Sequence, residues 1–313
     1  MQPRDRDTPL VSVVIPVYNG EPFIADCLQS VHEQTYRPLE VIVVDDGSTD
    51  RSLEIVKRSP GEIKIITQQH RDVSGARNAG IREAAGAYIA LLDQDDLWRP
   101  DKLIKQIDVF RQHPEIDLVF TDLIKFFPSG KRHHAADKDR LARSLTDDNL
   151  FAKLVRKNVL MPSSVMARRK SILDAGLFDE AFKTCGDYEL WLRMAALGMK
   201  FRYLPEPLTL YRHHGQNTSR QTAIMHADRV MAIEKAFGHP KLPQRHLPLQ
   251  RQALAAAYAL GAHTFFSIRA YEKFLENARR ALAYDWRVAS PKLVSRYLRS
   301  WLFARMGRAR RDA

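Results

Sequence analysis

Three carboxylates are crowded into the segment YIALLDQDDLW, residues 88–98. Asp93, Asp95 and Asp96 directly follow an apolar run that is typical of a buried strand. Carboxylates this close repel one another, most strongly in a crevice of low dielectric constant. Their hard oxygen atoms suit Mg²⁺ or Mn²⁺, and a cation held here can bind a diphosphate. The sequence therefore predicts a divalent cation site, the alternative being that these residues cap a helix expected from Pro100.

Polar residues also follow the other apolar runs of the N-terminal part. The segments PVYNG (16–20) and DDGSTD (45–50) each end a strand-like run. The carboxylates of the second segment can accept hydrogen bonds from a base or a ribose, and Gly47 permits a tight turn close to a ligand. The stretch SGARNAGI (74–81) is expected to open a helix with Arg77 in its first turn. A helix N-terminus beside a guanidinium favours phosphate binding.

The segment GDYELWLRMAALG (186–198) has the pattern of a helix with one apolar face, ended by Gly198. Asp187 then lies in the first turn, where the helix macrodipole favours an ionised carboxylate. A carboxylate there can act as a general base that takes the proton from an attacking hydroxyl. Glu189 lies about 200° further around the helix, so the two carboxylates cannot share this role. The alternative is that Asp187 only caps the helix.

Alternating strands and helices must position these residues. Continuous apolar runs at 11–16, 41–44, 62–67 and 88–92 are separated by amphipathic patterns, the first of them over residues 23–31. Such alternation predicts an α/β fold with a mostly parallel sheet that helices cover on both faces. Ligands of these folds bind beyond the carboxyl ends of the strands. The polar segments all fall at that edge.

Seven motifs, in this order and spacing, resemble family 2 glycosyltransferases with the GT-A fold. Four lie in the nucleotide-binding half: VSVVIPVYNG, VIVVDDGSTD, GARNAGI and YIALLDQDDLW. Three lie further on: SSVMARRKSILDAGLFDE (163–180), GDYELWLRMAALG (186–198) and YRHHGQNTS (211–219). The resemblance implies a GT-A catalytic domain over residues 8–220, followed by a basic, mostly helical region over residues 221–313.

The resemblance also implies an activity. A family member of this kind is an inverting transferase that moves a hexosyl or N-acetylhexosaminyl group from a nucleoside-diphosphate sugar, with UDP as the expected nucleotide. The acceptor is expected to be a hydroxyl of a glycan or a lipid-linked glycan in cell-surface polysaccharide biosynthesis, bordered by residues 131–149. Processive members carry a QxxRW motif and membrane spans after the catalytic half, and neither is present in this sequence. We therefore expect a single addition.

Donor-binding roles follow where the motifs match. By resemblance, Pro16 and Tyr18 line the base and ribose pocket. Asp46 is implied to accept the hydrogen bond of a uracil-type N–H, with Asp45 as the alternative partner. Arg77 is implied to face the diphosphate. Asp93 is implied to contact the ribose or to support the metal ion.

Metal and base roles follow in the same way. Asp95, in the DXD motif, is implied to bind the divalent cation. Arg212 and His214 match an Arg-x-His pattern, in which His214 completes the metal shell or contacts the diphosphate, unless it is an ordinary loop histidine. Asp96 is either part of the site or a helix cap. Asp187 is the implied catalytic base.

Rival functions are separated by specific features. Nucleic-acid binding is disfavoured because the positive charge accompanies no recognition motif. A nucleotide-sugar pyrophosphorylase would need a glycine-rich, basic loop after the first strand, and PVYNG is not such a loop. A catalytically inactive nucleotide-sugar-binding protein remains an alternative, although every expected carboxylate is present.

Positive charge is concentrated in the tail. The chain has a formal net charge of +12, and residues 221–313 hold 17 Lys and Arg against 6 Asp and Glu. Helices are expected at 250–263 and 269–284, and a last helix begins with Ser290 as its cap. Its apolar stripe, bordered by arginines, consists of Leu293, Val294, Tyr297, Leu298, Trp301 and Leu302. This pattern is typical of a helix on an anionic membrane surface, and equally of a helix packed on its own protein.

The sequence also suggests a location. No run of about 18 apolar residues predicts a transmembrane helix, and the charged N-terminus does not have the apolar core of a secretory signal. We therefore expect a cytoplasmic protein, held peripherally on the inner face of the cytoplasmic membrane if its tail binds lipid.

Overall fold

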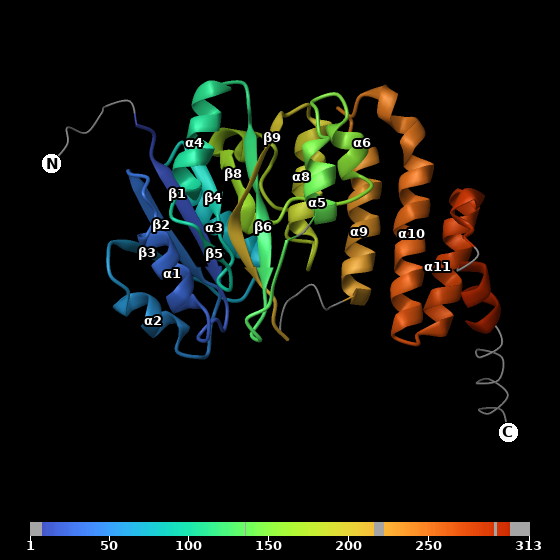
Figure 1. The fold of residues 1–313 in the computed structure, drawn as a ribbon, viewed down its shortest axis with the longest axis horizontal. Coiled ribbons are helices and arrows are strands. Elements are labelled where there is room, and N and C mark those ends of the chain that lie inside the picture. The colour runs from blue at the N-terminus through green and yellow to red at the C-terminus, as the bar shows by residue number, and fades with distance from the viewer. Residues whose placement is uncertain (1–7, 135, 216–221, 291–292, 301–313) are drawn as a thin grey trace.

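The computed structural model describes residues 8–134, 136–215, 222–290 and 293–300. Its N-terminal half contains the four predicted strands, all parallel and in the spatial order β3-β2-β1-β4 (Figure 1). They are β1 (Val11–Val17), β2 (Leu39–Asp45), β3 (Ile63–Thr67) and β4 (Tyr88–Leu91). Because parallel strands end at one edge of a sheet, the polar segments after β1, β2 and β4 meet there, as predicted.

The second half of the sheet is mixed. Beyond β4 the order continues β8-β6-β9-β5, and β7 pairs with β6. These strands are β5 (Leu97–Trp98), β6 (Leu118–Phe126), β7 (Arg132–His134), β8 (Val165–Arg168) and β9 (Phe201–Arg212). β8 runs antiparallel to β4, so the short helix η1 (Pro162–Ser164) before β8 lies beside the end of β4. β6 and β9 run parallel to each other and antiparallel to β8, so β9 ends at the same edge.

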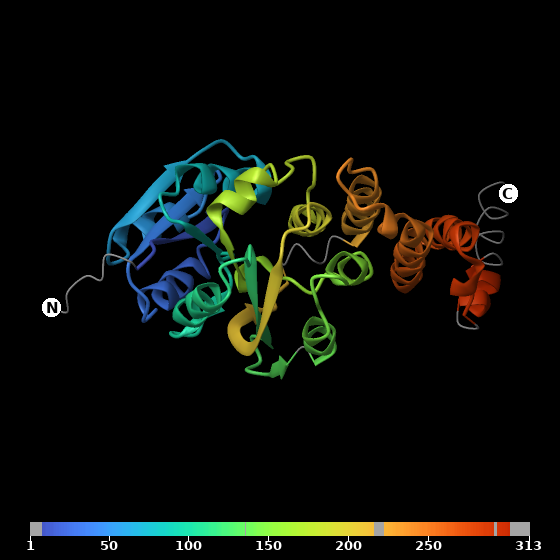
Figure 2. The same ribbon diagram turned by 90° about the horizontal axis from the view of Figure 1, so that it is seen from above.

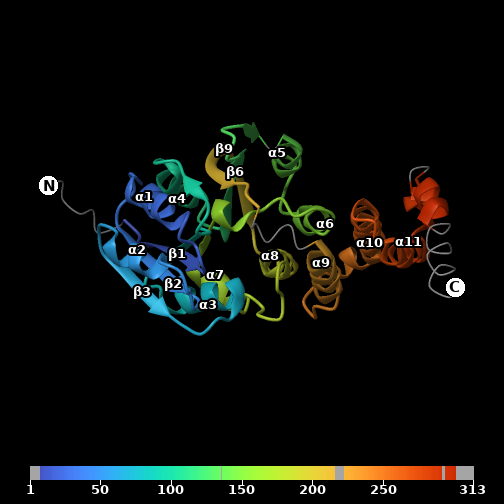
Figure 3. The ribbon, with the colours of Figure 1, turned by 90° about the horizontal axis from the view of Figure 1, so that it is seen from below.

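Helices cover both faces of the sheet, as its apolar strands require. Alternate residues of β1 divide between two hydrophobic cores, because successive side chains of a strand point to opposite faces. Val13 and Ile15 pack with α1 (Ile24–His32), α2 (Ser52–Arg58) and α4 (Lys102–Gln112). Val14 packs with α3 (Asp72–Glu83), α7 (Arg169–Asp174) and α8 (Gly186–Ala196) (Figure 3).

The C-terminal helices extend the molecule to one side. Helices α8, α9 (Thr222–Phe237), α10 (Gln250–Ser267) and α11 (Tyr271–Tyr284) stand side by side in a row (Figures 1 and 2), and the two helices expected in the tail are confirmed. The short helices α5 (Ala136–Arg143) and α6 (Leu150–Leu154) lie between this row and β6. Trp191 of α8, Ile233 of α9 and Leu254 of α10 belong to one hydrophobic core. The packing is therefore continuous between the two predicted domains, and their boundary at residue 220 stays a prediction.

The last helix packs partly on its own protein. Ser290 accepts a hydrogen bond from the backbone N–H of Leu293 (3.1 Å), as its capping role predicts. Leu293 is buried, and Tyr297 packs beside it, against α10 and α11. Val294 and Leu298 are exposed; the rest of the predicted stripe, Trp301 and Leu302, lies outside the described residues. Within the described ranges, no helix has both the length and the apolar composition that a membrane span requires.

Candidate active site

The three aspartates form the turn between β4 and β5. Ser163 of η1 accepts a hydrogen bond from the backbone N–H of Asp93 (3.1 Å) and donates one to Oδ2 of Asp96 (2.6 Å). The backbone N–H of Arg212 donates to Oδ1 of Asp96 (3.0 Å). Asp96 is buried, and α4 begins only at Lys102. The alternative that Asp96 caps that helix is therefore wrong: its carboxylate fastens the turn to η1 and β9.

Asp95 and His214 lie together at the open side of this turn. Nε2 of His214 is 2.7 Å from Oδ2 of Asp95, and the imidazole stacks on the ring of Phe23 with the ring centroids 4.5 Å apart. Burial raises the pKa of Asp95 and the charge of Asp93 raises it further, while His214 opposes the rise. The structure thus brings together the two residues for which sequence analysis implies a metal role.

Arg77 reaches the first aspartate. Its Nη2 lies 2.5 Å from Oδ1 of Asp93, and the guanidinium is buried against the ring of Phe178. The prediction that Arg77 lies in the first turn of its helix is wrong, because α3 begins at Asp72, whose carboxylate suits a helix N-terminus. Arg77 therefore meets the aspartate turn from the second turn of α3, away from the helix N-terminus.

Burial and neighbouring carboxylates both act on the aspartate turn. Burial and the charges of Asp95 and Asp93 raise the pKa of Asp96 well above its usual value, against hydrogen bonds from Ser163 and Arg212. Arg77 pairs with Asp93, and His214 with Asp95. A cation bound beside these carboxylates would favour their ionised form.

Tyr18 and Asp46 lie on neighbouring loops at the same edge. Tyr18 is exposed, and its ring stacks on that of His70 at a centroid distance of 4.1 Å. Asp46 is buried; its Oδ1 accepts hydrogen bonds from Nε2 of Gln68 (2.6 Å) and from the backbone N–H of Arg71 (2.9 Å). Its Oδ2 lies 2.7 Å from Nδ1 of His70. Both oxygens of Asp46 therefore contact the loop after β3. The Tyr18–His70 pair is more accessible to a ligand than the Asp46 carboxylate is.

The remaining nucleotide-side residues are placed around Tyr18. Pro16 is buried inside β1, so it supports the Tyr18 loop from within. Asp45, the alternative partner for a base, is buried and accepts a hydrogen bond from the backbone N–H of Ser48 (3.3 Å). Gly47 has φ +80°, and a side chain there would begin 3.3 Å from the backbone nitrogen of His70. The tight turn that the sequence predicts at Gly47 is thus confirmed.

Asp187 lies in the first turn of α8, as predicted, and is half-buried. Nδ2 of Asn158 donates a hydrogen bond to its Oδ2 (3.4 Å). Burial raises the pKa of Asp187, the charge of Arg77 lowers it, and the charge of Asp93 raises it again. Burial therefore opposes the preference for the ionised form that the position in the first turn predicts. The influence of Arg77 and Asp93 also shows that Asp187 faces the aspartate edge.

Glu189 has a separate, structural role. It is buried, its Oε2 lies 2.7 Å from Nη2 of Arg193, and its Oε1 lies 3.0 Å from Nζ of Lys235. The two carboxylates of α8 therefore point to different partners, as the helical geometry predicts.

Several residues that build the site are not apparent as site residues from the sequence. Ser163, His70 and Asn158 together contact five of the predicted residues. Asn158 is a single polar residue without a local pattern, and nothing in the motif that Ser163 begins points to the aspartates, so only the fold brings both to their partners. His70 had one usable signal, since it follows the strand 62–67 at the edge where the other strands carry polar residues.

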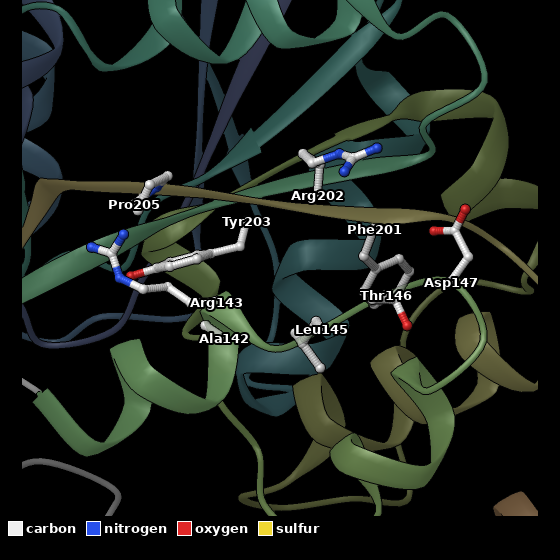
Figure 4. Close-up of a pocket in the computed structure, with 9 residues that line it drawn as sticks. All are labelled: Ala142, Arg143, Leu145, Thr146, Asp147, Phe201, Arg202, Tyr203 and Pro205. Carbon is white, nitrogen blue, oxygen red and sulfur yellow. The ribbon is translucent and has the colours of Figure 1, made fainter.

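Among the described residues, no three His, Cys, Asp or Glu side chains are grouped as a metal site. A cavity of about 500 Å³ opens at the start of β9 (Figure 4). Arg212, at the aspartate turn, is at the opposite end of that strand. The cavity is lined by Ala142, Arg143, Leu145, Thr146, Asp147, Phe201, Arg202, Tyr203 and Pro205. Part of the segment expected to border the acceptor thus lines this cavity, but no predicted site residue does.

The fold defines a glycosyltransferase of the GT-A type. The chain belongs to glycosyl transferase family 2, whose family model matches residues 12–175. It is 28% identical over 235 residues to an uncharacterized glycosyltransferase of Rickettsia typhi, a match that covers 74% of this chain and 72% of that protein.

Two solved structures show the same fold. Residues 1–349 of S. aureus TarS, in complex with UDP-GlcNAc, match with a TM-score of 0.68 and 20% identity over 95% of this chain and 92% of that one. The mannosyltransferase PcManGT from Pyrobaculum calidifontis, in complex with GDP-Man and Mn²⁺, matches with a TM-score of 0.63 and 20% identity over 95% of this chain and 80% of that one. These likenesses confirm the GT-A fold with a C-terminal helical extension.

Proposed function

We propose that this glycosyltransferase moves a hexosyl or N-acetylhexosaminyl group from a nucleoside-diphosphate sugar, preferably a UDP-sugar, to a hydroxyl of a glycan or lipid-linked glycan. The transfer inverts the anomeric carbon and adds one sugar per encounter. The observation that carries the proposal is the convergence of Arg77, Asp93, Asp95 and His214, from distant segments, beside Asp187. The nucleotide sugars bound by the two structural neighbours support it.

Asp95 and His214 would hold a divalent cation, Mn²⁺ or Mg²⁺. The supporting observation is the group of three carboxylates in the aspartate turn, where burial and then the neighbouring negative charges raise the pKa values of Asp95 and Asp96. A carboxylate and an imidazole form a donor set that suits Mn²⁺. When bound, the cation supplies positive charge against the donor diphosphate. Two protein ligands leave coordination positions for diphosphate oxygens.

The donor lies between the Tyr18–His70 pair and Arg77. The exposed aromatic pair offers a stacking surface for the base. Nε of Arg77 is buried and has no hydrogen-bond partner among the described residues, so a diphosphate oxygen that reaches it when the donor binds would supply the missing acceptor. Asp93, already paired with Arg77, fixes the guanidinium and lies within reach of the ribose in this proposal.

Asp187 takes the proton from the acceptor hydroxyl as the hydroxyl oxygen bonds to the anomeric carbon. The bond from that carbon to the diphosphate oxygen breaks on the opposite face, and its electron pair leaves with the nucleoside diphosphate beside Arg77. One carboxylate suffices because no covalent intermediate forms. The raised pKa of Asp187 supports this role, since a base accepts a proton better as its pKa approaches the working pH.

Donor hydrolysis tests the proposal without a known acceptor, because water can replace the hydroxyl. Several nucleotide sugars are incubated with the protein, with and without Mn²⁺, and release of the nucleoside diphosphate is measured. We expect release from one donor that depends on the cation. Binding without release would favour the inactive nucleotide-sugar-binding protein, and formation of a nucleoside triphosphate with added pyrophosphate would favour the pyrophosphorylase.

A further inference from the structure

Helix α8 begins without a cap of its own. Its N-cap residue, Cys185, makes no side-chain capping hydrogen bond, although the first N–H groups of a helix need acceptors. Helix α9 holds the two residues that lead into α8. Oδ2 of Asp228 accepts hydrogen bonds from the backbone N–H of Thr184 (2.6 Å), the hydroxyl of Thr184 (2.9 Å) and the backbone N–H of Cys185 (3.2 Å).

The same stretch of α9 makes two more contacts with this end of α8. The backbone carbonyl of Met225 lies 3.5 Å from Sγ of Cys185. The guanidinium of Arg229 lies over the ring of Tyr188, 5.4 Å from its centroid. Helix α9 therefore contacts residues on either side of Asp187 in the sequence, Cys185 and Tyr188.

On its other side the turn has no room to move. A side chain at Gly186 would begin 2.5 Å from Oγ of Ser74 on α3, so the backbone of α8 lies directly against α3. Asp228 is itself buried, and hydrogen bonds to a buried carboxylate are charge-assisted and strong. The position of Asp187 is thus set from one side by α3 and from the other by α9.

We propose that Asp228 is a positioning residue for the catalytic base Asp187, so that helix α9 of the basic C-terminal region belongs to the catalytic machinery. This inference rests on the proposed role of Asp187. The reaction needs the carboxylate within hydrogen-bond reach of the attacking hydroxyl, and a small displacement of a catalytic group lowers the rate steeply. Donor binding does not need Asp228, because the donor contacts come from the loops after β1 to β4 and from α3.

The test compares Asp228→Ala with Asp228→Asn in the full chain, using donor hydrolysis. Asp228→Ala removes the acceptor, and kcat should fall about ten- to a hundredfold while KM for the donor stays unchanged. Asp228→Asn keeps an acceptor oxygen and should restore most of kcat. Thr184→Val removes only the hydroxyl donor and should lower kcat less than Asp228→Ala does. It replaces Asp228→Ala in the test if that variant does not fold.

Lys235→Met is the matched control. Lys235 also joins α9 to α8, through Glu189, but away from Asp187, so its loss should lower thermal stability with little change in kcat. Amide exchange in residues 184–187 should accelerate in Asp228→Ala and not in Lys235→Met. If Asp228→Ala keeps the wild-type kcat, or loses no more than Lys235→Met, the inference is wrong. Retained turnover in Asp187→Asn would instead overturn the proposed function.

Discussion

Nε2 of His214 lies 2.7 Å from Oδ2 of Asp95, although 119 positions separate the two residues in the chain. The contact forms because β9 ends at the same edge of the sheet as β4, where the aspartate turn begins. In the function that we propose, this imidazole and this carboxylate are two ligands of a divalent cation.

The first prediction concerns that cation. Asp95→Ala removes one of the proposed ligands, so it should abolish Mn²⁺-dependent nucleotide binding and nearly all donor hydrolysis. Titration calorimetry with UDP, with and without Mn²⁺, measures the binding. Asp101→Ala, at an exposed aspartate paired with Lys105, is the control and should behave as wild type. Undiminished activity in excess chelator would rule out the cation.

The second prediction concerns the base. Asp187→Asn keeps the shape of the side chain but removes the proton acceptor, so turnover should fall by about 10²- to 10⁴-fold. Donor affinity should stay near that of the wild type, because the donor contacts lie elsewhere. Steady-state hydrolysis and a separate donor-binding titration distinguish the two quantities. If affinity collapsed and turnover survived, Asp187 would be a structural residue.

The third prediction follows from the raised pKa of Asp187. The carboxyl group binds its proton more tightly in the folded chain than in the unfolded chain, so the fold loses stability as the pH rises through the folded pKa. Asp187→Asn removes this cost and should therefore raise Tm at pH 7. The gain should shrink towards the usual pKa of 3.8, below which both states are protonated.

Thermal unfolding between pH 4 and 7 measures this difference in Tm. Asp148→Asn, at an exposed aspartate, is the control and should show no such gain. A Tm of Asp187→Asn at or below that of the wild type at pH 7 would show that burial does not penalise the charged form.

The fourth prediction concerns Ser163, which links the backbone of Asp93 to the carboxylate of Asp96. Ser163→Ala leaves two buried polar groups without this partner, so it should lower the free energy of unfolding by about 1–3 kcal/mol. The loosened turn should also weaken Mn²⁺-dependent UDP binding. Urea unfolding and the calorimetric titration measure the two effects, with the exposed Ser267→Ala as control. A stable variant with normal binding would contradict the role of Ser163.

The fifth prediction concerns the basic tail. Removal of residues 301–313 should release the protein from anionic vesicles at low salt, because each basic residue near such a surface contributes about 1 kcal/mol. The cut is placed after residue 300 because Leu293 is buried in the protein's own core. Leu298→Asp, at an exposed position, should weaken binding as well. Vesicle co-sedimentation across a salt series measures the effect.

Donor hydrolysis should survive this truncation and provides the control for folding. High salt should release the intact protein, since surface charge is screened within about 8 Å at physiological ionic strength. If the intact protein does not bind anionic vesicles even at low salt, the last helix packs on its own protein or on a partner subunit, and the membrane interpretation is wrong.

The parallel half of the sheet could be predicted from the sequence, and the mixed half could not. β1, β2 and β4 are largely apolar runs, whose pattern indicates buried parallel strands, while β3 carries Lys64 and is only partly buried. β5 has two residues and β7 has three exposed ones, so neither carries a periodic signal. Their pairing depends on β6 and β9, which are distant in the chain.

The predicted site residues could be recognised in the sequence for one shared physical reason. Asp95 and Asp187 stand next to apolar runs, where a charged residue is conspicuous. Their supports are hidden because no such contrast marks Ser163 or Asp228 in the sequence, and the contacts that matter lie 43 or more positions away. The start of α3 was misplaced because Asp72 and Val73 precede the small-residue stretch that marks the helix in the sequence.

The anomeric configuration of the first sugar released in donor hydrolysis tests the central claim most directly. The claim is that one carboxylate, Asp187, activates the attacking oxygen in a single displacement at the anomeric carbon. With an α-linked nucleotide sugar, proton NMR of the early reaction should therefore show the β-anomer first, and the signal should be absent in Asp187→Asn. Release of the α-anomer first, or an unchanged rate in Asp187→Asn, would contradict the mechanism.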